Sequence, residues 1–193
     1  MGSPDLGKIF KAYDVRGVYT DELDEDVARR IGAAFAEWTK EPRIVLGRDC
    51  RLSSPALAAA LIEGMTSRGA DVVDAGLVST DLLYFASGDL DVPGVMLTAS
   101  HNPKQYNGLK FCRSGAAPVG EETGLREIRD LAERDEYPAS EREGRVEKRE
   151  LLESYVRHVL GFVDASRANN VEYRVKTHSG ASIAFLSATS PSC

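Results

Sequence analysis

The residues best suited to chemistry lie in one short segment, Ser100-His101-Asn102-Pro103, which Ala99 joins to the apolar run 94–98. A serine hydroxyl is a weak nucleophile unless a base, a cation or a reactive phosphorylated substrate lies beside it. His101 is a candidate base, although neighbours in sequence need not face each other. Lys110 returns a positive charge towards the segment and could act as a point charge for a phosphate. The pattern therefore makes Ser100 a candidate nucleophile.

The same segment also has the composition of a plain turn, because Asn102 and Pro103 are both turn-forming residues. A serine hydrolase fits poorly, since the sequence has no G-x-S-x-G elbow and no acid that obviously pairs with a histidine. The P-loop pattern and the G-x-G-x-x-G fingerprint are both absent. The residues alone leave two alternatives open, a turn without chemistry and a serine that handles phosphate.

Alternating strand and helix patterns place Ser100 at the end of a strand. Short apolar or β-branched runs predict four strands, at 43–47, 71–76, 94–98 and 108–112. Helical spacing of apolar residues and capping residues predict helices at 24–38, 53–69, 79–85, 121–133 and 147–163. In α/β sheets, functional groups lie in loops beyond the carboxyl ends of strands, which is where Ser100 falls.

This order of elements predicts an α/β fold, a three-layer α/β/α domain with a four-stranded mixed, mostly parallel sheet, over residues 1–164. A short link without helical period suggests that the chain reverses direction between the third and fourth strands. Residues 133–148 are charge-rich and look like a solvated linker or hairpin. Residues 165–193 lose the helical pattern, although 171–175 could form one strand. We expect this tail to be either frayed or a truncated, out-of-frame end.

The composition limits the class of protein. The chain has 193 residues, of which 42% are hydrophobic and 28% charged, as in ordinary soluble globular proteins. A net charge of −6 disfavours a nucleic-acid partner. The separated cysteines, Cys50, Cys112 and Cys193, predict neither a disulfide framework nor a zinc site, and we expect Cys50 and Cys112 to be buried as small hydrophobes. Without a signal-like or membrane-spanning run, cytoplasmic localisation and no membrane contact are the expectations.

Three motifs occur in the order found in the α-D-phosphohexomutase family. TASHNP at 98–103, followed by YNGLK at 106–110, resembles the phosphoserine loop of that family. IFKAYDVRG at 9–17 resembles its N-terminal signature, and GRDCRLSSP at 47–55 resembles the next motif. The similarity extends over roughly residues 7–163. The combination is most similar to the bacterial phosphomannomutase/phosphoglucomutase branch, and the phosphoglucosamine mutase branch is the alternative.

The resemblance implies that Ser100 carries a phosphoryl group and that its phosphate oxygen is a ligand of Mg²⁺. It implies a reaction that interconverts hexose 6-phosphate and hexose 1-phosphate, with a hexose 1,6-bisphosphate as intermediate and activator. Phosphoryl transfer depends mostly on positioning and on stabilisation of charge by cations. The implied catalytic residues are Ser100, Lys110, Arg16 and His101, and the implied substrate-binding residues are Tyr13 and Asn102.

Plainer roles remain open for several of these residues. Arg16 could pair with a nearby surface carboxylate, and Lys110 could be a solvated lysine of an edge strand. Tyr13 could belong to the core. Arg48 and Asp49 could form a structural ion pair near a strand end.

The family is built from four domains, and the sequence resembles only the first. No D-G-D-x-D-R loop is present, because Asp130, Asp135 and Asp164 are isolated. A metal ion needs several hard oxygen ligands, so Ser100 cannot hold Mg²⁺ alone. We therefore expect a chain that carries the phosphorylation site but does not complete turnover. The alternative is a non-catalytic truncated fold that binds sugar phosphate weakly or not at all. The sequence leaves the preferred sugar and the oligomeric state undetermined.

Overall fold

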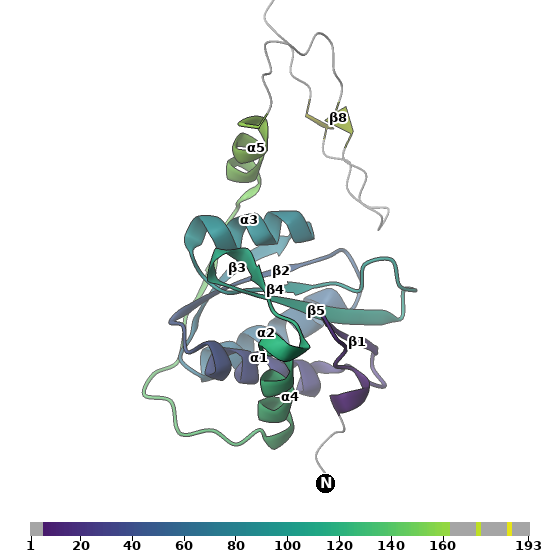
Figure 1. Cartoon of the computed structure of the whole chain (residues 1–193), viewed down its shortest axis with the longest axis vertical. Helices are drawn as coiled ribbons and strands as arrows, with labels where there is room; N and C mark the ends of the chain where they lie inside the picture. The colour runs from purple at the N-terminus through teal and green to yellow at the C-terminus, as the bar shows by residue number, and fades with distance from the viewer. Residues whose placement is uncertain (1–5, 163–172, 175–184, 187–193) are drawn as a thin grey trace, which may run out of the picture.

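The structure is a computed structural model that describes residues 6–162 and two short strands beyond them (Figure 1). A mixed sheet has the strand order β1-β5-β4-β2-β3-β7, and β6 pairs with β5. Its strands are β1 Val15–Val18, β2 Arg43–Arg48, β3 Asp71–Leu77, β4 Gly94–Leu97, β5 Tyr106–Arg113, β6 Ala117–Pro118 and β7 Val146–Lys148. Further on, β8 Tyr173–Arg174 pairs with β9 Phe185–Leu186. The strand expected at 171–175 overlaps β8, and the other expectations for 165–193 lie outside the described residues.

The strand directions follow the predicted mixed pattern. Strands β4, β2, β3 and β7 are parallel, whereas β5 is antiparallel to both β4 and β1. The predicted reversal is confirmed by the pairing of Leu97 on β4 with Leu109 on β5. The four expected strands correspond to β2, β3, β4 and β5, and the sheet is larger because β1, β6 and β7 extend it. These three strands are short. Strand β7 is an exposed edge strand, and its residues belong to the charge-rich segment 133–148, where no strand was predicted.

Five α-helices accompany the sheet in the described part of the chain. They are α1 Glu25–Thr39, α2 Ser54–Ser67, α3 Thr80–Leu90, α4 Leu125–Arg134 and α5 Leu152–Leu160. Single 3₁₀ turns lie at Leu6–Lys8, Ser114–Ala116 and Glu121–Thr123. The Asp24 carboxylate caps α1 by accepting from the Val27 N–H at 2.8 Å. The helix expected over 147–163 begins only at Leu152, because its first residues pair with β3 as β7.

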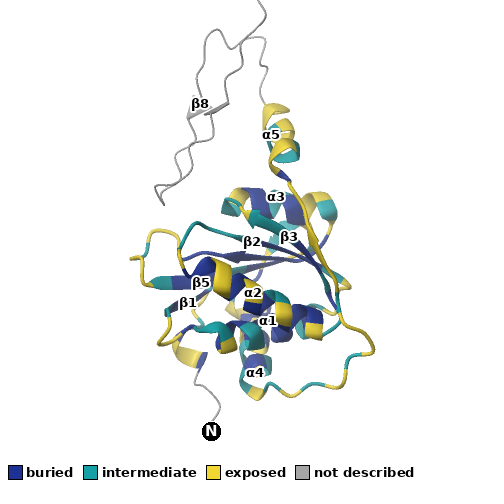
Figure 2. Ribbon diagram, turned by 180° about the vertical axis from the view of Figure 1, so that it is seen from behind, coloured by how far each residue is buried: buried dark blue, intermediate teal, exposed yellow. Residues whose placement is uncertain are grey.

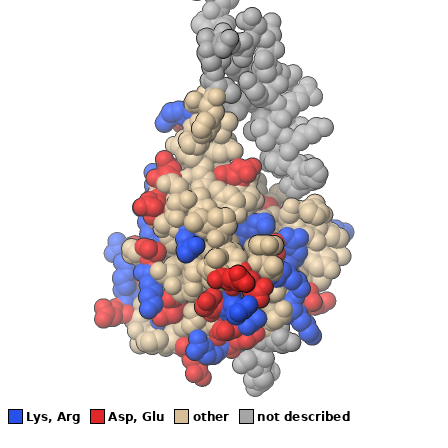
Figure 3. All heavy atoms as spheres, in the orientation of Figure 1, with Lys and Arg blue, Asp and Glu red and all other residues tan. Residues whose placement is uncertain are grey.

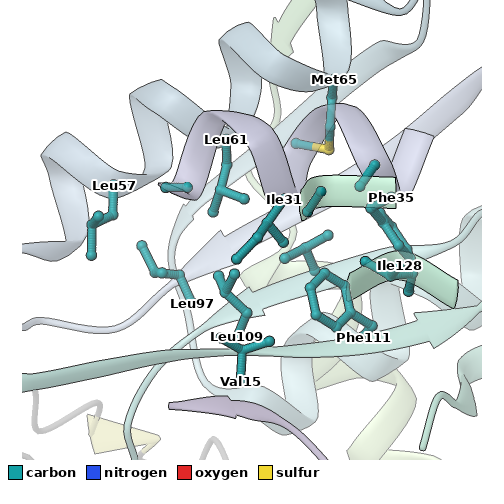
Figure 4. Close-up of a cluster of buried hydrophobic side chains, with 14 of the residues drawn as sticks. Val15, Ile31, Phe35, Leu57, Leu61, Met65, Leu97, Leu109, Phe111 and Ile128 are labelled. Atoms are coloured by element: carbon teal, nitrogen blue, oxygen red, sulfur yellow. The ribbon is translucent and has the colours of Figure 1, made fainter. Parts of the chain in front are cut away.

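Helices cover both faces of the sheet and so form three layers (Figures 1 and 2). Helices α1, α2 and α4 lie on one face, and α3 lies on the other. The larger core cluster is on the α1–α2 side, where the Phe35 ring lies 4.8 Å from that of Phe111 on β5 (Figure 4). Successive residues alternate between the faces, since Ile44 joins this cluster and Val45 joins the one under α3. The expected α/β/α architecture is confirmed.

The two cysteines of the described region differ in burial. Cys112 is buried on β5, and this burial raises the pKa of its thiol. Cys50 is only partly buried, so the expectation that both are buried hydrophobes holds for Cys112 alone. We expect Cys112 to behave as an inert core residue.

The surface of the domain carries charges of both signs. On the face shown in Figure 3, Lys and Arg side chains are interspersed with those of Asp and Glu. Within the part of the chain that the structure describes, every helix is too short or too polar to cross a bilayer.

The charge-rich segment 133–148 is anchored to the domain by Tyr137. Its hydroxyl donates to the Leu131 carbonyl at 3.0 Å, and the Arg68 guanidinium lies 4.9 Å from the centre of its ring. Arg68 also donates to the Pro138 carbonyl at 2.6 Å. Burial raises the pKa of Tyr137 from 10.0 to about 12. The segment is therefore more than a solvated linker.

This raised pKa predicts a pH dependence of stability. The contribution of the protonated hydroxyl is fully present below pH 10.0, the unfolded pKa, and is lost as the pH rises towards about 12. We expect the unfolding free energy of the wild type, minus that of Tyr137→Phe, to fall across this interval. Urea unfolding at a series of pH values measures the difference. A difference that stays constant with pH would contradict the assignment.

Candidate functional site

Ser100 lies in the loop that joins β4 to β5, three residues beyond the carboxyl end of β4 at Leu97. Its side chain is exposed, and its φ of 53° puts the backbone in the left-handed region, which residues other than glycine seldom adopt. The Ser100 N–H donates to the Thr98 hydroxyl at 3.0 Å. The Ser100 Oγ lies 3.3 Å from Nδ1 of His101. The structure thus brings the candidate nucleophile and the candidate base together.

Asn102 closes the turn that follows Ser100. Its backbone N–H and its side-chain Nδ2 both donate to the Ala99 carbonyl, at 3.0 and 2.9 Å. This geometry agrees with the turn-forming character of Asn102. Its side-chain Nδ2 is used for a hydrogen bond within the loop. A substrate contact by Asn102 remains a prediction.

Arg51 is the residue that most clearly holds the loop, and sequence reasoning missed it. Its Nη2 donates to the carbonyls of Ser100 and Asn102 at 2.8 and 2.7 Å. Its Nη1 donates to the carbonyls of Pro103 and Tyr106 at 2.8 and 3.0 Å. One side chain therefore binds four main-chain oxygens of the serine loop. The sequence signal that could have identified Arg51 was its position within the GRDCRLSSP motif.

Asp49 in turn fixes Arg51. Its carboxylate accepts from the Arg51 Nε at 3.2 Å and from the Arg51 backbone N–H at 3.0 Å. It also accepts from the hydroxyls of Ser54 and Thr98 at 2.7 and 2.8 Å. The ion pair predicted between Arg48 and Asp49 is wrong, because the Asp49 carboxylate is used for Arg51 instead.

Asn107 attaches the other end of the loop to the start of helix α2, and Gly108 packs it closely against β1. The fully buried Asn107 donates through Nδ2 to the hydroxyls of Ser53 and Ser54, at 2.8 and 3.0 Å. A Cβ atom at Gly108 would lie 2.3 Å from the Val15 carbonyl oxygen, so only glycine fits at this position between the paired strands β1 and β5. The YNGLK and GRDCRLSSP motifs are therefore parts of one packed unit.

A second polar cluster joins Arg16 and Lys110. Nη2 of Arg16 lies 2.5 Å from Oδ2 of Asp14, and Nζ of Lys110 lies 3.3 Å from the same oxygen. The buried Nε of Arg16 has no hydrogen-bond partner. The three formal charges sum to +1, so the cluster keeps an excess positive charge. Pairing of Arg16 with a nearby carboxylate, one of the plainer alternatives, is confirmed in this structure.

The two clusters lie on neighbouring strands. Lys110 on β5 pairs with Met96 on β4, the strand that leads to Ser100, and Arg16 on β1 pairs with Gly108 on β5. Among the described residues, no hydrogen bond or ion pair joins the cations to the Ser100 side chain. Tyr13 is 81% exposed just before β1, so a core role for it is wrong. The structure leaves its side chain available to a ligand.

A magnesium ion would need more ligands than the described residues supply. No group of three or more His, Cys, Asp or Glu side chains within them is arranged to hold a metal ion. The Asp49 carboxylate, which accepts a hydrogen bond from Thr98 at the start of the loop, is occupied by Arg51 and two hydroxyls. The described residues therefore do not form a magnesium site by themselves.

The fold and site define an α/β/α domain that presents a serine beyond a strand end, with cations on the adjacent strands. Residues 7–139 match the family model described as phosphoglucomutase/phosphomannomutase, alpha/beta/alpha domain I. The chain belongs to this family. The resemblance inferred from the three motifs is confirmed.

Known proteins similar to this chain carry the same family names. A phosphomannomutase of Escherichia coli K12 is 42% identical over 175 residues, which cover 89% of this chain and 38% of that protein. A protein of Xanthomonas campestris named phosphohexose mutases is 44% identical over 172 residues, with the same coverages. A crystal structure of a phosphoglucomutase/phosphomannomutase family protein from Burkholderia thailandensis has a TM-score of 0.74 at 33% identity, covering 83% of this chain and 36% of that one. The chain thus spans well under half the length of these relatives.

Proposed function

We propose that this chain is the first domain of a phosphohexomutase and that Ser100 carries the phosphoryl group. In the proposed reaction, a hexose 6-phosphate and a hexose 1-phosphate interconvert through a hexose 1,6-bisphosphate. The observation that carries the proposal is the exposed, left-handed Ser100 in a loop fixed by Arg51, beyond the end of β4. The phosphomannomutase relatives support the same reaction class.

The proposed transfer step uses Ser100 as acceptor. Its Oγ attacks one phosphorus atom of the bisphosphate, the bond from that phosphorus to the sugar oxygen breaks, and the serine proton passes to the departing sugar oxygen. His101 Nδ1, at 3.3 Å from Oγ, is placed to orient the hydroxyl. Arg16 and Lys110 would balance phosphate charge, and Tyr13 would line the same site.

We further propose that these residues act within a longer polypeptide. Mg²⁺ and the bisphosphate activator belong to the complete enzyme in this proposal, because the described residues do not form a metal site. The domain boundary at residue 164 and a cytoplasmic location are part of the same proposal. The ligand of the domain is then a sugar phosphate. The alternative is a non-catalytic fold, which the following experiment would reveal by a Ser100 that stays unmodified.

Phosphorylation of Ser100 tests the proposal directly. The purified 193-residue chain is incubated with glucose 1,6-bisphosphate and Mg²⁺, and its tryptic peptides are analysed by mass spectrometry. We expect one phosphoryl group on Ser100, with none on the Ser100→Ala variant. An unmodified Ser100 would overturn the retained chemical role. Conversion of glucose 1-phosphate to the 6-phosphate by the chain alone would contradict the claim that it does not complete turnover.

A further inference from the structure

We propose that Arg51, held by Asp49, is a positioning residue that fixes the backbone of Ser100 and thereby the direction of its hydroxyl. This inference rests on the proposed function of Ser100, and it adds a residue to that site. Arg51 lies 49 residues before Ser100 in the sequence and reaches it only through the fold. Its role is carried by hydrogen bonds to main-chain oxygens, none of which depends on the loop side chains.

The donor count of Arg51 indicates what the side chain does. A guanidinium has five N–H donors. The Nε group faces Asp49, the two of Nη2 are directed at Ser100 and Asn102, and the two of Nη1 are directed at Pro103 and Tyr106. All five donors are thus used inside the protein. Arg51 therefore has none left for a phosphate, which distinguishes it from Arg16 with its unpartnered Nε.

The loop needs such a support because of its backbone conformation. A left-handed φ at a residue with a Cβ atom is unfavourable and persists where the surroundings enforce it. Arg51 binds the Ser100 carbonyl itself and three carbonyls that follow it, so rotation of the Ser100 peptide would break the guanidinium network. Both Arg51 and Asp49 are nearly buried, with side chains 10% and 11% exposed. The bonds from Arg51 to Asp49, Asn102 and Tyr106 are therefore partly shielded from water, whereas those to Ser100 and Pro103 lie at the surface.

The Arg51→Lys substitution separates positioning from simple charge. The lysine side chain would keep the positive charge, but it has three donors on one nitrogen and cannot reproduce the planar fork. If Arg51 acted through charge alone, Arg51→Lys would resemble the wild type and Arg51→Gln would not. If Arg51 positions the loop, both variants lose the slow amide exchange of the loop and the fast phosphorylation of Ser100. The matched control is Arg126→Gln, which removes an exposed arginine paired with Glu121.

The readouts are amide exchange in the loop and phosphorylation of Ser100, both on the 193-residue chain. Exchange measured by NMR follows the hydrogen-bonded amides of Ser100, Asn102 and Tyr106, with Ile128 in α4 as an internal reference. We expect Arg51→Lys and Arg51→Gln to speed loop exchange at least tenfold, to leave the Ile128 amide unchanged, and to slow phosphorylation by glucose 1,6-bisphosphate at least tenfold. Arg126→Gln should change neither.

Two results test the positioning role of Arg51 independently of the proposed function of Ser100. Unchanged loop exchange in Arg51→Lys overturns the positioning role, whether or not Ser100 accepts a phosphate. If the wild type is not phosphorylated but the loop loosens in Arg51→Lys, the proposed function fails and the positioning of the Ser100 backbone stands. Should either Arg51 variant fail to fold, Asp49→Asn weakens the support while retaining the guanidinium. Asp49→Asn is then expected to speed exchange of the Asn102 and Tyr106 amides, which do not bond to Asp49 or to its partner Thr98, at least threefold, and unchanged exchange overturns the proposal.

Discussion

Replacing Gly64 by alanine is expected to lower the unfolding free energy of the domain by about 3 kcal/mol or more. Gly64 lies where α2 crosses α1, and a Cβ atom there would lie 2.0 Å from the Arg29 carbonyl oxygen and 2.8 Å from the Ala33 nitrogen. These are backbone atoms, so no side-chain rotation relieves the overlap. The facing Gly32 is equally tight, since its Cβ would lie 2.4 Å from the Leu61 carbonyl oxygen. The helices would have to separate, and the core beneath them would lose contacts.

Gly88→Ala is the matched control for this substitution. Gly88 lies within α3, and a Cβ atom added there has no neighbour within 4 Å. Alanine is the better helix former, so we expect this variant to be more stable than the wild type by about 0.5–1 kcal/mol. Urea unfolding followed by circular dichroism compares the two variants. Equal stability of Gly64→Ala and the wild type would show that the helices can move apart at little cost.

Periodicity predicted the elements that bury a long apolar face. Helix α1 is a good example, because Asp24 caps it and its apolar residues recur at helical spacing. Strands β1, β6 and β7 were missed because they are only 4, 2 and 3 residues long, too short to show an alternating pattern. The close crossing at Gly32 and Gly64 also leaves no periodic signal, since a glycine marks a tight contact only when its neighbour in space is known.

The candidate site was predictable where a motif is contiguous in sequence. Ser100 and His101 were found because they are adjacent, and their geometry agrees with the expectation. The roles of Arg51 and Asp49 could not be inferred in this way, because their partners lie in a loop about fifty residues further along the chain. The sequence also did not determine whether Tyr13 is buried or exposed, since an aromatic residue in a loop can belong either to a core or to a ligand-binding surface.

Arg16→Gln is expected to slow phosphoryl uptake by Ser100 about 100-fold, which corresponds to about 2.7 kcal/mol of transition-state stabilisation. Phosphoryl transfer is accelerated chiefly by preorganised cations, and Arg16 and Lys110 are held by the same Asp14 oxygen. Arg16 also has the unpartnered Nε that could donate to a phosphate oxygen. Without Arg16, the formal charge of the cluster falls from +1 to 0.

The same substitution is expected to change stability less than activity, because the largely buried Asp14 carboxylate keeps a cationic partner in Lys110 at 3.3 Å. This separation of effects distinguishes Arg16 from Arg51, whose replacement should loosen the serine loop. The measurement is the initial rate of phosphate incorporation from glucose 1,6-bisphosphate, with Arg126→Gln as the control for loss of a surface arginine. A rate within about threefold of the wild type would remove Arg16 from the site. A lowered rate together with faster loop exchange would instead assign Arg16 a structural role, since charge stabilisation alone leaves the loop unchanged.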